Sequence, residues 1–275
     1  MKVECNICPH HCKLEEGRLG ICRGRINRDG KVVSENYGKL TAMALDPIEK
    51  KPLYHFHPGS RILSVGSYGC NLNCPFCQNC DISMVGSREI EVQEISCEEL
   101  VRKAQQLTSR GNIGIAYTYN EPLIGFEFVR DCAKQLKSQG LKNVVVTNGY
   151  ICSEPLEELL PFIDAFNIDL KGFTEEFYHK LRGDLATVKQ SIELAVKASH
   201  VEVTTLIIPD ENDSEEEMEA LSGWLAGISP KIPLHISRFF PRWRMQDKKA
   251  TPVETVYRLA EIARKKLSYV HEGNV

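Results

Sequence analysis

Residues 61–77 read Arg-Ile-Leu-Ser-Val-Gly-Ser-Tyr-Gly-Cys-Asn-Leu-Asn-Cys-Pro-Phe-Cys, a short apolar run followed at once by three closely spaced cysteines. The run at 62–65 predicts a buried β-strand, and Cys70, Cys74 and Cys77 then fall in the loop that leaves it. In parallel α/β folds the functional loops follow the carboxyl ends of the strands. This stretch therefore predicts both the first strand of a parallel sheet and the position of a site beside it.

After this stretch, strand-like apolar runs alternate with segments of helical period. The runs lie at 62–65, 113–117, 144–147, 165–169, 201–208 and 233–236. Six strand–helix units imply a parallel sheet with crossover helices, and they are fewer than the eight of a closed barrel. We therefore expect an α/β fold, a partial (β/α)6 TIM-like barrel with a small Cys-rich N-terminal module. Periodicity alone leaves a doubly wound sheet as the alternative.

The first 59 residues differ from the rest of the chain. They carry four cysteines, two short β-like runs at 31–37 and 40–45, and prolines at 47, 52 and 58. A segment of this kind has few residues with which to build a core of its own. We expect residues 1–59 to form a Cys-rich metal-binding module with a connecting segment, and residues 60–275 to form the barrel.

Composition narrows the class of protein. The 34 basic and 37 acidic residues give a formal charge of −3, which argues against nucleic-acid binding. The amino terminus has no signal-peptide core, and no run of 18 apolar residues predicts a membrane span. We therefore expect a cytoplasmic protein. Thiols stay reduced there, so most of its 11 cysteines point to metal binding or catalysis rather than disulfides.

The central cysteines are spaced CxxxCxxC, which lets one loop hold three corners of a [4Fe-4S] cluster. Three ligands leave one iron open for a substrate or cofactor. Two alternatives remain: Cys80 could close the cluster as an electron-transfer centre, or some of these cysteines could join the N-terminal set around zinc. The position after the first strand, with Phe76 before the last cysteine, favours the catalytic interpretation. Cys97, Cys132 and Cys152 are expected to be small buried residues.

Several motifs, taken in order, resemble the radical SAM superfamily, whose signature is CxxxCxφC with φ aromatic. The resemblance is closer to glycyl-radical-enzyme activases such as pyruvate formate-lyase activating enzymes, and closest to the radical SAM member of the AmmeMemoRadiSam system. The residues that carry it are Tyr68-Gly-Cys-Asn-Leu-Asn-Cys-Pro-Phe-Cys-Gln-Asn79, Thr118-Tyr-Asn-Glu-Pro122, Thr147-Asn-Gly149, Asp169-Leu-Lys171 and Pro233-Leu-His-Ile-Ser-Arg-Phe239.

The resemblance implies an oxidoreductase that reductively cleaves S-adenosylmethionine at a [4Fe-4S] cluster held by Cys70, Cys74 and Cys77. The products are methionine and a 5′-deoxyadenosyl radical, which takes a hydrogen atom from a protein or peptide. Implied partners are a low-potential donor such as ferredoxin or flavodoxin, and Memo-type proteins. A non-catalytic iron–sulfur carrier and a zinc-binding interaction protein are the competing functions.

The resemblance also implies cofactor contacts. Phe76 would pack near the adenine. Asn120 and Glu121 match a cofactor-binding segment in which Glu121 would accept the methionine ammonium, and the remaining residues would border the ribose, methionine or substrate. Those remaining residues are Thr147, Asn148, Gly149, Asp169, Lys171 and His235. From the residues alone, Glu121 could instead cap a helix, Asp169 and Lys171 could form a surface ion pair, and His235 could be a core histidine.

Two positions depart from the family pattern. Tyr119 and Asn120 stand where glycines are common, which puts backbone access at that segment in doubt. Val146 stands where activases commonly have an aspartate that helps to hold a monovalent cation, so a complete cation site is not expected.

The N-terminal cysteines form a second set. Cys5, Cys8, Cys12 and Cys22 follow a CxxCxxxC pattern completed by a later cysteine. Four thiolates at such spacing suit a structural tetrahedral zinc site, and they equally suit a second iron–sulfur cluster. Spacing leaves both alternatives open.

Overall fold

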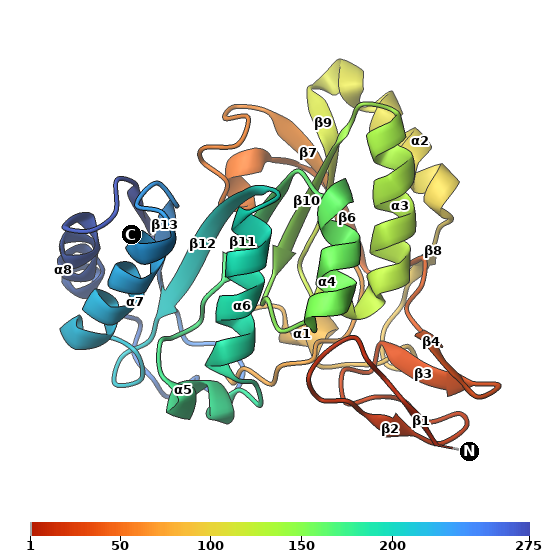
Figure 1. The fold of residues 1–275 in the computed structure, drawn as a ribbon, viewed down its shortest axis with the longest axis horizontal. Helices are drawn as coiled ribbons and strands as arrows, with labels where there is room; N and C mark the ends of the chain where they lie inside the picture. Colours follow the sequence, from red (N-terminus) through yellow and green to blue (C-terminus); the bar gives the residue numbers. More distant parts are fainter. Residues whose placement is uncertain (1) are drawn as a thin grey trace.

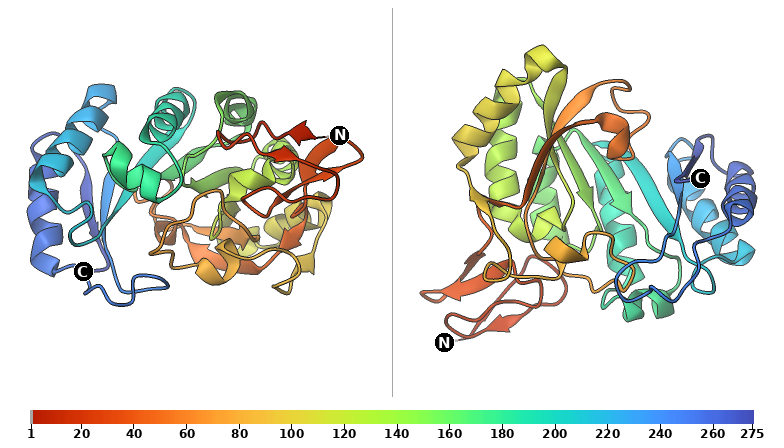
Figure 2. Two further views of the ribbon diagram at one scale, coloured as in Figure 1. Left: turned by 90° about the horizontal axis from the view of Figure 1, so that it is seen from below. Right: turned by 180° about the vertical axis from the view of Figure 1, so that it is seen from behind.

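A parallel β-sheet, open at its edges, organises the computed structural model, which describes residues 2–275. Over these residues the main sheet has eight strands in the order β14-β13-β12-β11-β10-β9-β7-β6. The strands are β6 (Ala42–Pro47), β7 (Arg61–Gly66), β9 (Asn112–Tyr117), β10 (Lys142–Thr147), β11 (Ala165–Asp169), β12 (His200–Ile207), β13 (Leu234–Arg238) and β14 (Val270–Gly273). Only β6 runs antiparallel to its neighbour within this sheet as described. The sheet curves with helices along its outer face (Figures 1 and 2).

The strand order confirms the partial barrel. From β7 to β14 the strands lie side by side in chain order, without the reversal that defines a doubly wound sheet. All six expected runs are strands of this sheet. The sequence count stops short of β14, because its residues, Val-His-Glu-Gly, form no apolar run. The first strand also gains an antiparallel neighbour, β6, which comes from the connecting part of residues 1–59.

Capping side chains set the starts of several helices. Ser96 and Glu99 form a capping box before α2 (Cys97–Gln106), and Thr174, Asp184 and Ser214 cap α5 (Glu175–Lys180), α6 (Leu185–Val196) and α7 (Glu215–Ile228). The remaining helices are α1 (Cys80–Ser83), α3 (Phe126–Ser138), α4 (Ser153–Leu159) and α8 (Val253–Arg264). Short 3-10 turns are η1 (Ile48–Lys50), η2 (Thr108–Arg110), η3 (Pro122–Gly125) and η4 (Leu160–Phe162). No helix within residues 2–275 is long and apolar enough to cross a bilayer.

The N-terminal segment forms short antiparallel ladders beside the carboxyl ends of the barrel strands (Figure 1). Strand β1 (Val3–Glu4) pairs with β2 (Lys13–Leu14), and β3 (Arg25–Arg28) pairs with β4 (Lys31–Ser34). A further ladder joins β5 (Lys39–Leu40) to β8 (Gln93–Glu94). Ladders this short depend on contacts outside themselves for stability. The division of the chain at residue 59 stays a prediction.

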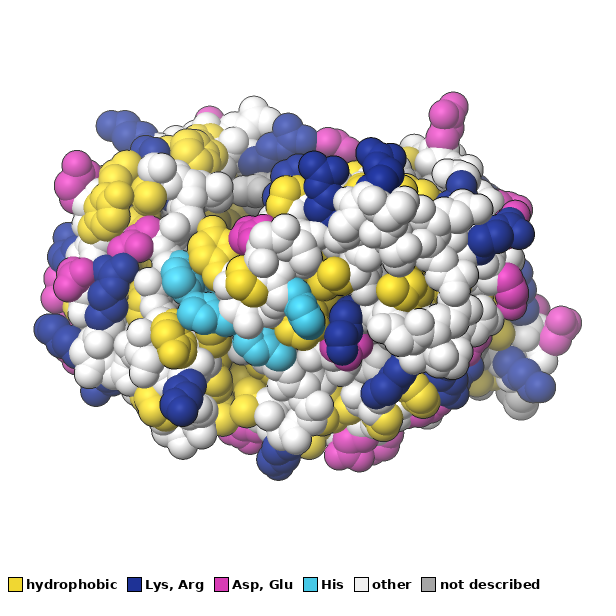
Figure 3. All heavy atoms as spheres, turned by 90° about the horizontal axis from the view of Figure 1, so that it is seen from above, with side chains coloured by type: hydrophobic (Ala, Val, Ile, Leu, Met, Phe, Trp, Pro, Cys, Tyr) yellow, Lys and Arg dark blue, Asp and Glu magenta, His cyan; other side chains and the backbone are white. Residues whose placement is uncertain are grey.

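The amino ends of the strands are closed by the connection between β6 and β7. Ile48 and Leu53 from this connection pack with Ile62, Ala116, Val144 and Ala165 in a separate apolar cluster. The buried carboxylate of Glu202 accepts hydrogen bonds from the backbone N–H groups of Tyr54 and His55. His55 also lies 2.9 Å from His271, Nε2 to Nε2. Figure 3 looks onto this end and shows histidine side chains gathered beside hydrophobic ones.

Candidate functional site

The CxxxCxxC loop lies between β7 and α1, at the carboxyl end of the first parallel strand. The backbone N–H of Leu72 points to the Cys70 sulfur at 3.4 Å, and the N–H of Cys77 bonds the Cys74 carbonyl at 3.2 Å. Asn73 is anchored to the rest of the barrel by a bond from its N–H to the Leu181 carbonyl. The loop is thus shaped by its own backbone and by a later turn of the chain.

The three thiols lie in surroundings that favour the protonated form until a cation binds. Burial raises the pKa of Cys70 well above its ordinary value, helped by the charges of Glu121 and the neighbouring cysteines, and burial is the main cause that raises the pKa of Cys74 to about 12. Lys171 acts in the opposite direction on the pKa of Cys74 and Cys77. Iron ligation removes the thiol proton, so a cluster suits this donor set. Within residues 2–275 no three Cys, His, Asp or Glu side chains are already arranged around one ion, so binding requires side-chain rotation.

Cys80, the alternative fourth ligand, is buried at the start of α1. Its sulfur lies 3.6 Å from a carboxylate oxygen of Asp81, and its charge would raise the pKa of Cys77. Cys80 is therefore a neighbour of the loop.

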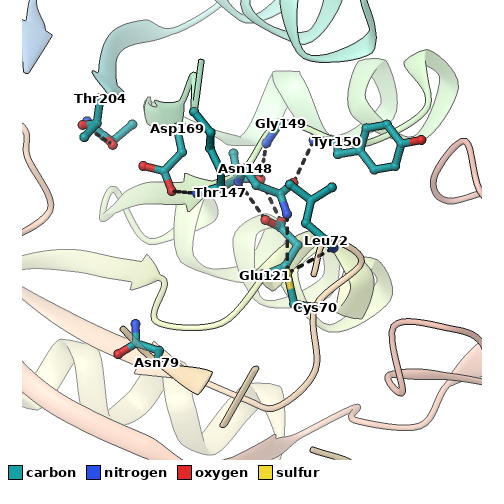
Figure 4. Close-up of polar contacts among 12 residues, drawn as sticks. Cys70, Leu72, Asn79, Glu121, Thr147, Asn148, Gly149, Tyr150, Asp169 and Thr204 are labelled. Carbon is teal, nitrogen blue, oxygen red and sulfur yellow. Dashed lines mark hydrogen bonds and ion pairs between the residues drawn. The ribbon is translucent and has the colours of Figure 1, made fainter. Parts of the chain in front are cut away.

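Glu121 links two strand ends at this edge of the barrel (Figure 4). Its Oε1 accepts from the Leu123 N–H and from the Thr147 hydroxyl at 2.8 Å, and its Oε2 accepts from the Asn148 N–H at 2.8 Å. Burial raises the pKa of Glu121 to about 7 against these hydrogen bonds. The carboxylate caps η3, with Pro122 in its first turn. Helix capping is the alternative role that the sequence offered for Glu121. The carboxylate also retains lone-pair capacity on Oε2 for another donor.

Asn120 and Tyr119 show what replaces the glycines common at this segment. Asn120 accepts from the Ser67 N–H and donates to the Tyr68 and Gly69 carbonyls, so it holds the backbone leading into Cys70. Tyr119 has φ of +75°, a conformation that glycine adopts freely. A bond from its hydroxyl to Asp46, at 2.7 Å, helps to keep it there.

The Thr147–Gly149 turn contacts the cysteine loop directly. The Asn148 side chain donates to the Asn71 side chain at 2.9 Å. It also lies 3.6 Å from the Cys70 sulfur (Figure 4). Gly149 has φ of +69°, and a Cβ there would lie 2.9 Å from Ile168, so the turn requires glycine. Three segments far apart in sequence, 70–77, 121 and 147–149, therefore meet at one edge.

Asp169, the last residue of β11, forms an ion pair at 2.9 Å with Lys171 just beyond it. Burial opposes the charge on Lys171, but Asp169 and Cys74 together raise its pKa. The sequence offered a surface ion pair as an alternative for these two residues. The ion pair forms, but it faces the cysteine loop rather than open surface. Phe76, buried in the same loop, stacks on Phe177 with ring centroids 6.2 Å apart.

His235 is not brought together with these residues. No hydrogen bond or ring contact found among residues 2–275 joins it to the Cys70, Glu121 or Asn148 side chains; its Nε2 lies 2.6 Å from Glu202. Its buried position beside Tyr54 and His271 is that of a core histidine. Val146, on β10, offers no carboxylate in place of the aspartate that is common in activases at this position.

Some site residues escaped the sequence reasoning. Asn71 donates to the Tyr150 carbonyl at 2.6 Å and accepts from Asn148, so it joins the cysteine loop to the turn after β10. The only sign of this role in the sequence is the position of Asn71 between Cys70 and Leu72. Cys97 and Cys132 are buried as expected, but their sulfurs also lie 3.1 Å apart, which their sequence separation concealed.

The N-terminal cysteines surround a small cavity of about 10 Å³, whose lining includes Cys5, Cys8, Cys12, Cys22, Arg25 and Ile124. Burial raises the pKa of Cys8 to about 12 and that of Cys22 to about 11. The structure therefore places the four cysteines of this second set around one cavity.

Comparison with known proteins gives consistent findings. The family model described as the radical SAM superfamily matches residues 64–221. An uncharacterized protein of Methanocaldococcus jannaschii is 40% identical over 278 residues, covering 100% of this chain and 82% of that protein. A pyruvate formate-lyase-activating enzyme of Clostridium pasteurianum is 28% identical, covering 62% of this chain and 71% of its own length. Among solved structures, Streptococcus suis SuiB bound to precursor peptide SuiA has a TM-score of 0.57 at 16% identity, covering 82% of this chain and 51% of SuiB.

Proposed function

The chain belongs to the radical SAM superfamily, and from that premise we propose that Cys70, Cys74 and Cys77 hold its [4Fe-4S] cluster and leave one iron for S-adenosylmethionine. The family implies both groups. When bound and reduced, the cluster supplies the electron that cleaves S-adenosylmethionine to methionine and a 5′-deoxyadenosyl radical. The observation that carries the proposal is the contact of the Cys70 sulfur, the Asn148 amide and the Glu121 carboxylate at the carboxyl ends of the strands.

Glu121 would accept the ammonium of the methionine moiety. The carboxylate is buried, and burial raises its pKa to about 7 although its hydrogen bonds and the charge of Lys171 act against the rise. An incoming ammonium would form a charge-assisted hydrogen bond and stabilise the ionised form. Thr147 and the Asn148 N–H would keep the carboxylate oriented, and Gly149 would let the backbone approach the cofactor.

Asp169 and Lys171 would border the same site from β11. Lys171 lies close enough to Cys74 to lower that thiol's pKa, so it would offset the negative charge of the ligated loop. Phe76 would offer a flat apolar surface to the adenine. His235, proposed from the sequence as a further cofactor residue, would have to act from its place beside Glu202.

We propose a protein or peptide as the hydrogen donor. Relatives named pyruvate formate-lyase-activating enzymes act on a protein by their names, and the fold is shared with SuiB, solved with a precursor peptide. The open barrel would admit such a substrate. A low-potential donor such as ferredoxin or flavodoxin would supply the electron, in the cytoplasm. The closer likeness to the AmmeMemoRadiSam member, with Memo-type partners, stays a prediction.

The N-terminal cysteines are proposed to bind a second metal centre, either zinc or a further iron–sulfur cluster. Their shared cavity supports metal binding of some kind.

Anaerobic reconstitution tests the function. Protein reduced with dithionite should convert S-adenosylmethionine to 5′-deoxyadenosine, and a matched Cys74→Ala preparation should not. If both preparations yield the same background, the chain is an iron–sulfur carrier or a zinc-binding protein instead.

A further inference from the structure

Cys22 lines the cavity that the N-terminal cysteines share, and its backbone carbonyl lies against Gly69, the residue before Cys70. We propose that Cys5, Cys8, Cys12 and Cys22 bind one zinc ion, and that the zinc module fixes the backbone at Gly69 and Asn71 and so positions Cys70. The zinc assignment stands on its own, whereas the positioning role rests on the proposed function of Cys70.

The size of the cavity favours the smaller of the two candidate metal centres. Its volume of about 10 Å³ is close to that of a single water-sized sphere. Small side-chain rotations would turn thiol sulfurs onto one ion of that size. An iron–sulfur cubane, with its several irons and bridging sulfides, is much larger and would have to displace Ile124 or the backbone near Gly20.

A hydrogen-bond donor at the cavity suits a metal thiolate. The sulfurs of zinc bound by four thiolates carry negative charge and accept hydrogen bonds from nearby N–H groups. Arg25 lines the cavity and is itself buried, and its Nε has no hydrogen-bond partner within residues 2–275. The other end of this guanidinium is fixed by Glu127 of α3, with Nη2 at 2.8 Å. Arg25 thus holds a free N–H for a ligated sulfur, as outer groups of metal sites do.

The backbone of Cys22 approaches the central loop closely. Gly69 has φ of +85°, and a Cβ at this position would lie 2.3 Å from the Cys22 carbonyl oxygen. Gly69 immediately precedes Cys70. A residue that ligates the N-terminal ion is therefore packed directly against the residue that leads into the cluster loop.

Two further contacts run along the same interface. His10, between the second and third cysteines of the set, lies 2.7 Å from the Asn71 carbonyl through its Nε2. The Cys152 N–H donates to the Ile7 carbonyl at 2.9 Å, beside the turn that follows β10. One of these contacts thus holds the Asn71 carbonyl, and the other holds the turn whose Tyr150 carbonyl accepts from the Asn71 side chain.

Metal analysis without the central cluster tests the zinc assignment. A Cys70→Ala/Cys74→Ala/Cys77→Ala protein, purified without oxygen, should contain about one zinc ion per chain by mass spectrometry and no stoichiometric iron or sulfide. Iron and sulfide near four per chain, or no metal at all, would overturn it. Arg25→Ala should weaken zinc binding about tenfold in a chelator competition, while Cys152→Ser should match the parent.

His10→Ala tests the positioning role without removing a ligand, because it deletes only the contact of this side chain with the Asn71 carbonyl. This variant should keep its zinc but lose about tenfold in 5′-deoxyadenosine formation, and the electron paramagnetic resonance signal of its reduced cluster should differ from that of the parent. An unchanged signal and unchanged cleavage would overturn the positioning role. If the parent protein itself failed to cleave S-adenosylmethionine while zinc remained, the proposed function would fail and the zinc assignment would survive.

Discussion

The two cysteine sets of this chain lie close together, but different side chains surround them. Cys5, Cys8, Cys12 and Cys22 surround one small cavity with sulfur on several sides and the Arg25 guanidinium as their charged neighbour. Around the central set, by contrast, the residues are mixed: an amide from Asn148, a carboxylate from Glu121 and the ammonium of Lys171. A set that supplies all its ligands itself suits a structural ion. The central set has only three cysteines, and the polar groups beside it could bind the amino and carboxylate groups of a cofactor. Such a set suits cofactor binding.

The largest expected effect comes from removing a central ligand. Cys70→Ala should abolish formation of 5′-deoxyadenosine, since the cluster would lack a protein ligand, whereas Cys80→Ala should retain it. Product is measured by chromatography after anaerobic reduction. Equal loss in both variants would make Cys80 a fourth ligand, and both cysteine sets would then supply four protein ligands.

Glu121→Gln should lower cleavage by ~10- to 100-fold, because the amide cannot pair with an ammonium as a carboxylate does. Turnover at saturating and limiting S-adenosylmethionine would separate weaker binding from slower chemistry. A variant with parental kinetics would leave Glu121 as a helix cap alone.

The same carboxylate predicts a pH dependence of stability in cofactor-free protein. Its pKa is about 7 in the folded state against 4.5 as the ordinary value, so the folded state binds the proton more tightly. Between these two values stability should fall as pH rises, by ~3 kcal/mol in total. Denaturant melts at pH 5 and pH 7.5 measure it, and Glu121→Gln should remove most of this slope. A slope that persists in full would assign the effect to other groups.

Lys171→Met should have a smaller effect, about tenfold in cleavage, because Asp169 then remains uncompensated near Cys74. The midpoint potential of the cluster should also fall, since a nearby positive charge is lost. An unchanged potential would mean that the ion pair acts only in packing.

The smallest effect on catalysis is expected at His235. His235→Asn should lower the free energy of unfolding by about 1–3 kcal/mol, because Glu202 loses a buried partner. The KM for S-adenosylmethionine should stay at the parental value. A clear rise in KM would return His235 to the cofactor residues predicted from the sequence.

The sequence predicted the barrel well because its strands are signalled by apolar runs. It missed β14, whose alternating polar residues become a strand only through pairing with β13. It also could not show that β6 joins the sheet, because an antiparallel neighbour at an edge depends on a distant register. Long-range pairing, rather than local propensity, decided both elements.

For the site, motifs placed the central cysteines, Glu121 and the Thr147–Gly149 turn at strand ends, where the structure gathers them. Motif position could not show that Asn120 holds the backbone before Cys70, or that Asn71 bridges two loops. The contact between Cys22 and Gly69 was equally hidden, since it joins segments whose spacing carries no signal. Such contacts depend on the packed geometry of several loops at once.

Electron paramagnetic resonance of the reduced cluster, with and without S-adenosylmethionine, tests the central claim most directly. If Cys70, Cys74 and Cys77 leave one iron open, the cofactor should change the signal, and methionine labelled with 15N in its amino group should add a resolved coupling. A signal indifferent to the cofactor, in protein with full iron and sulfide, would contradict the account.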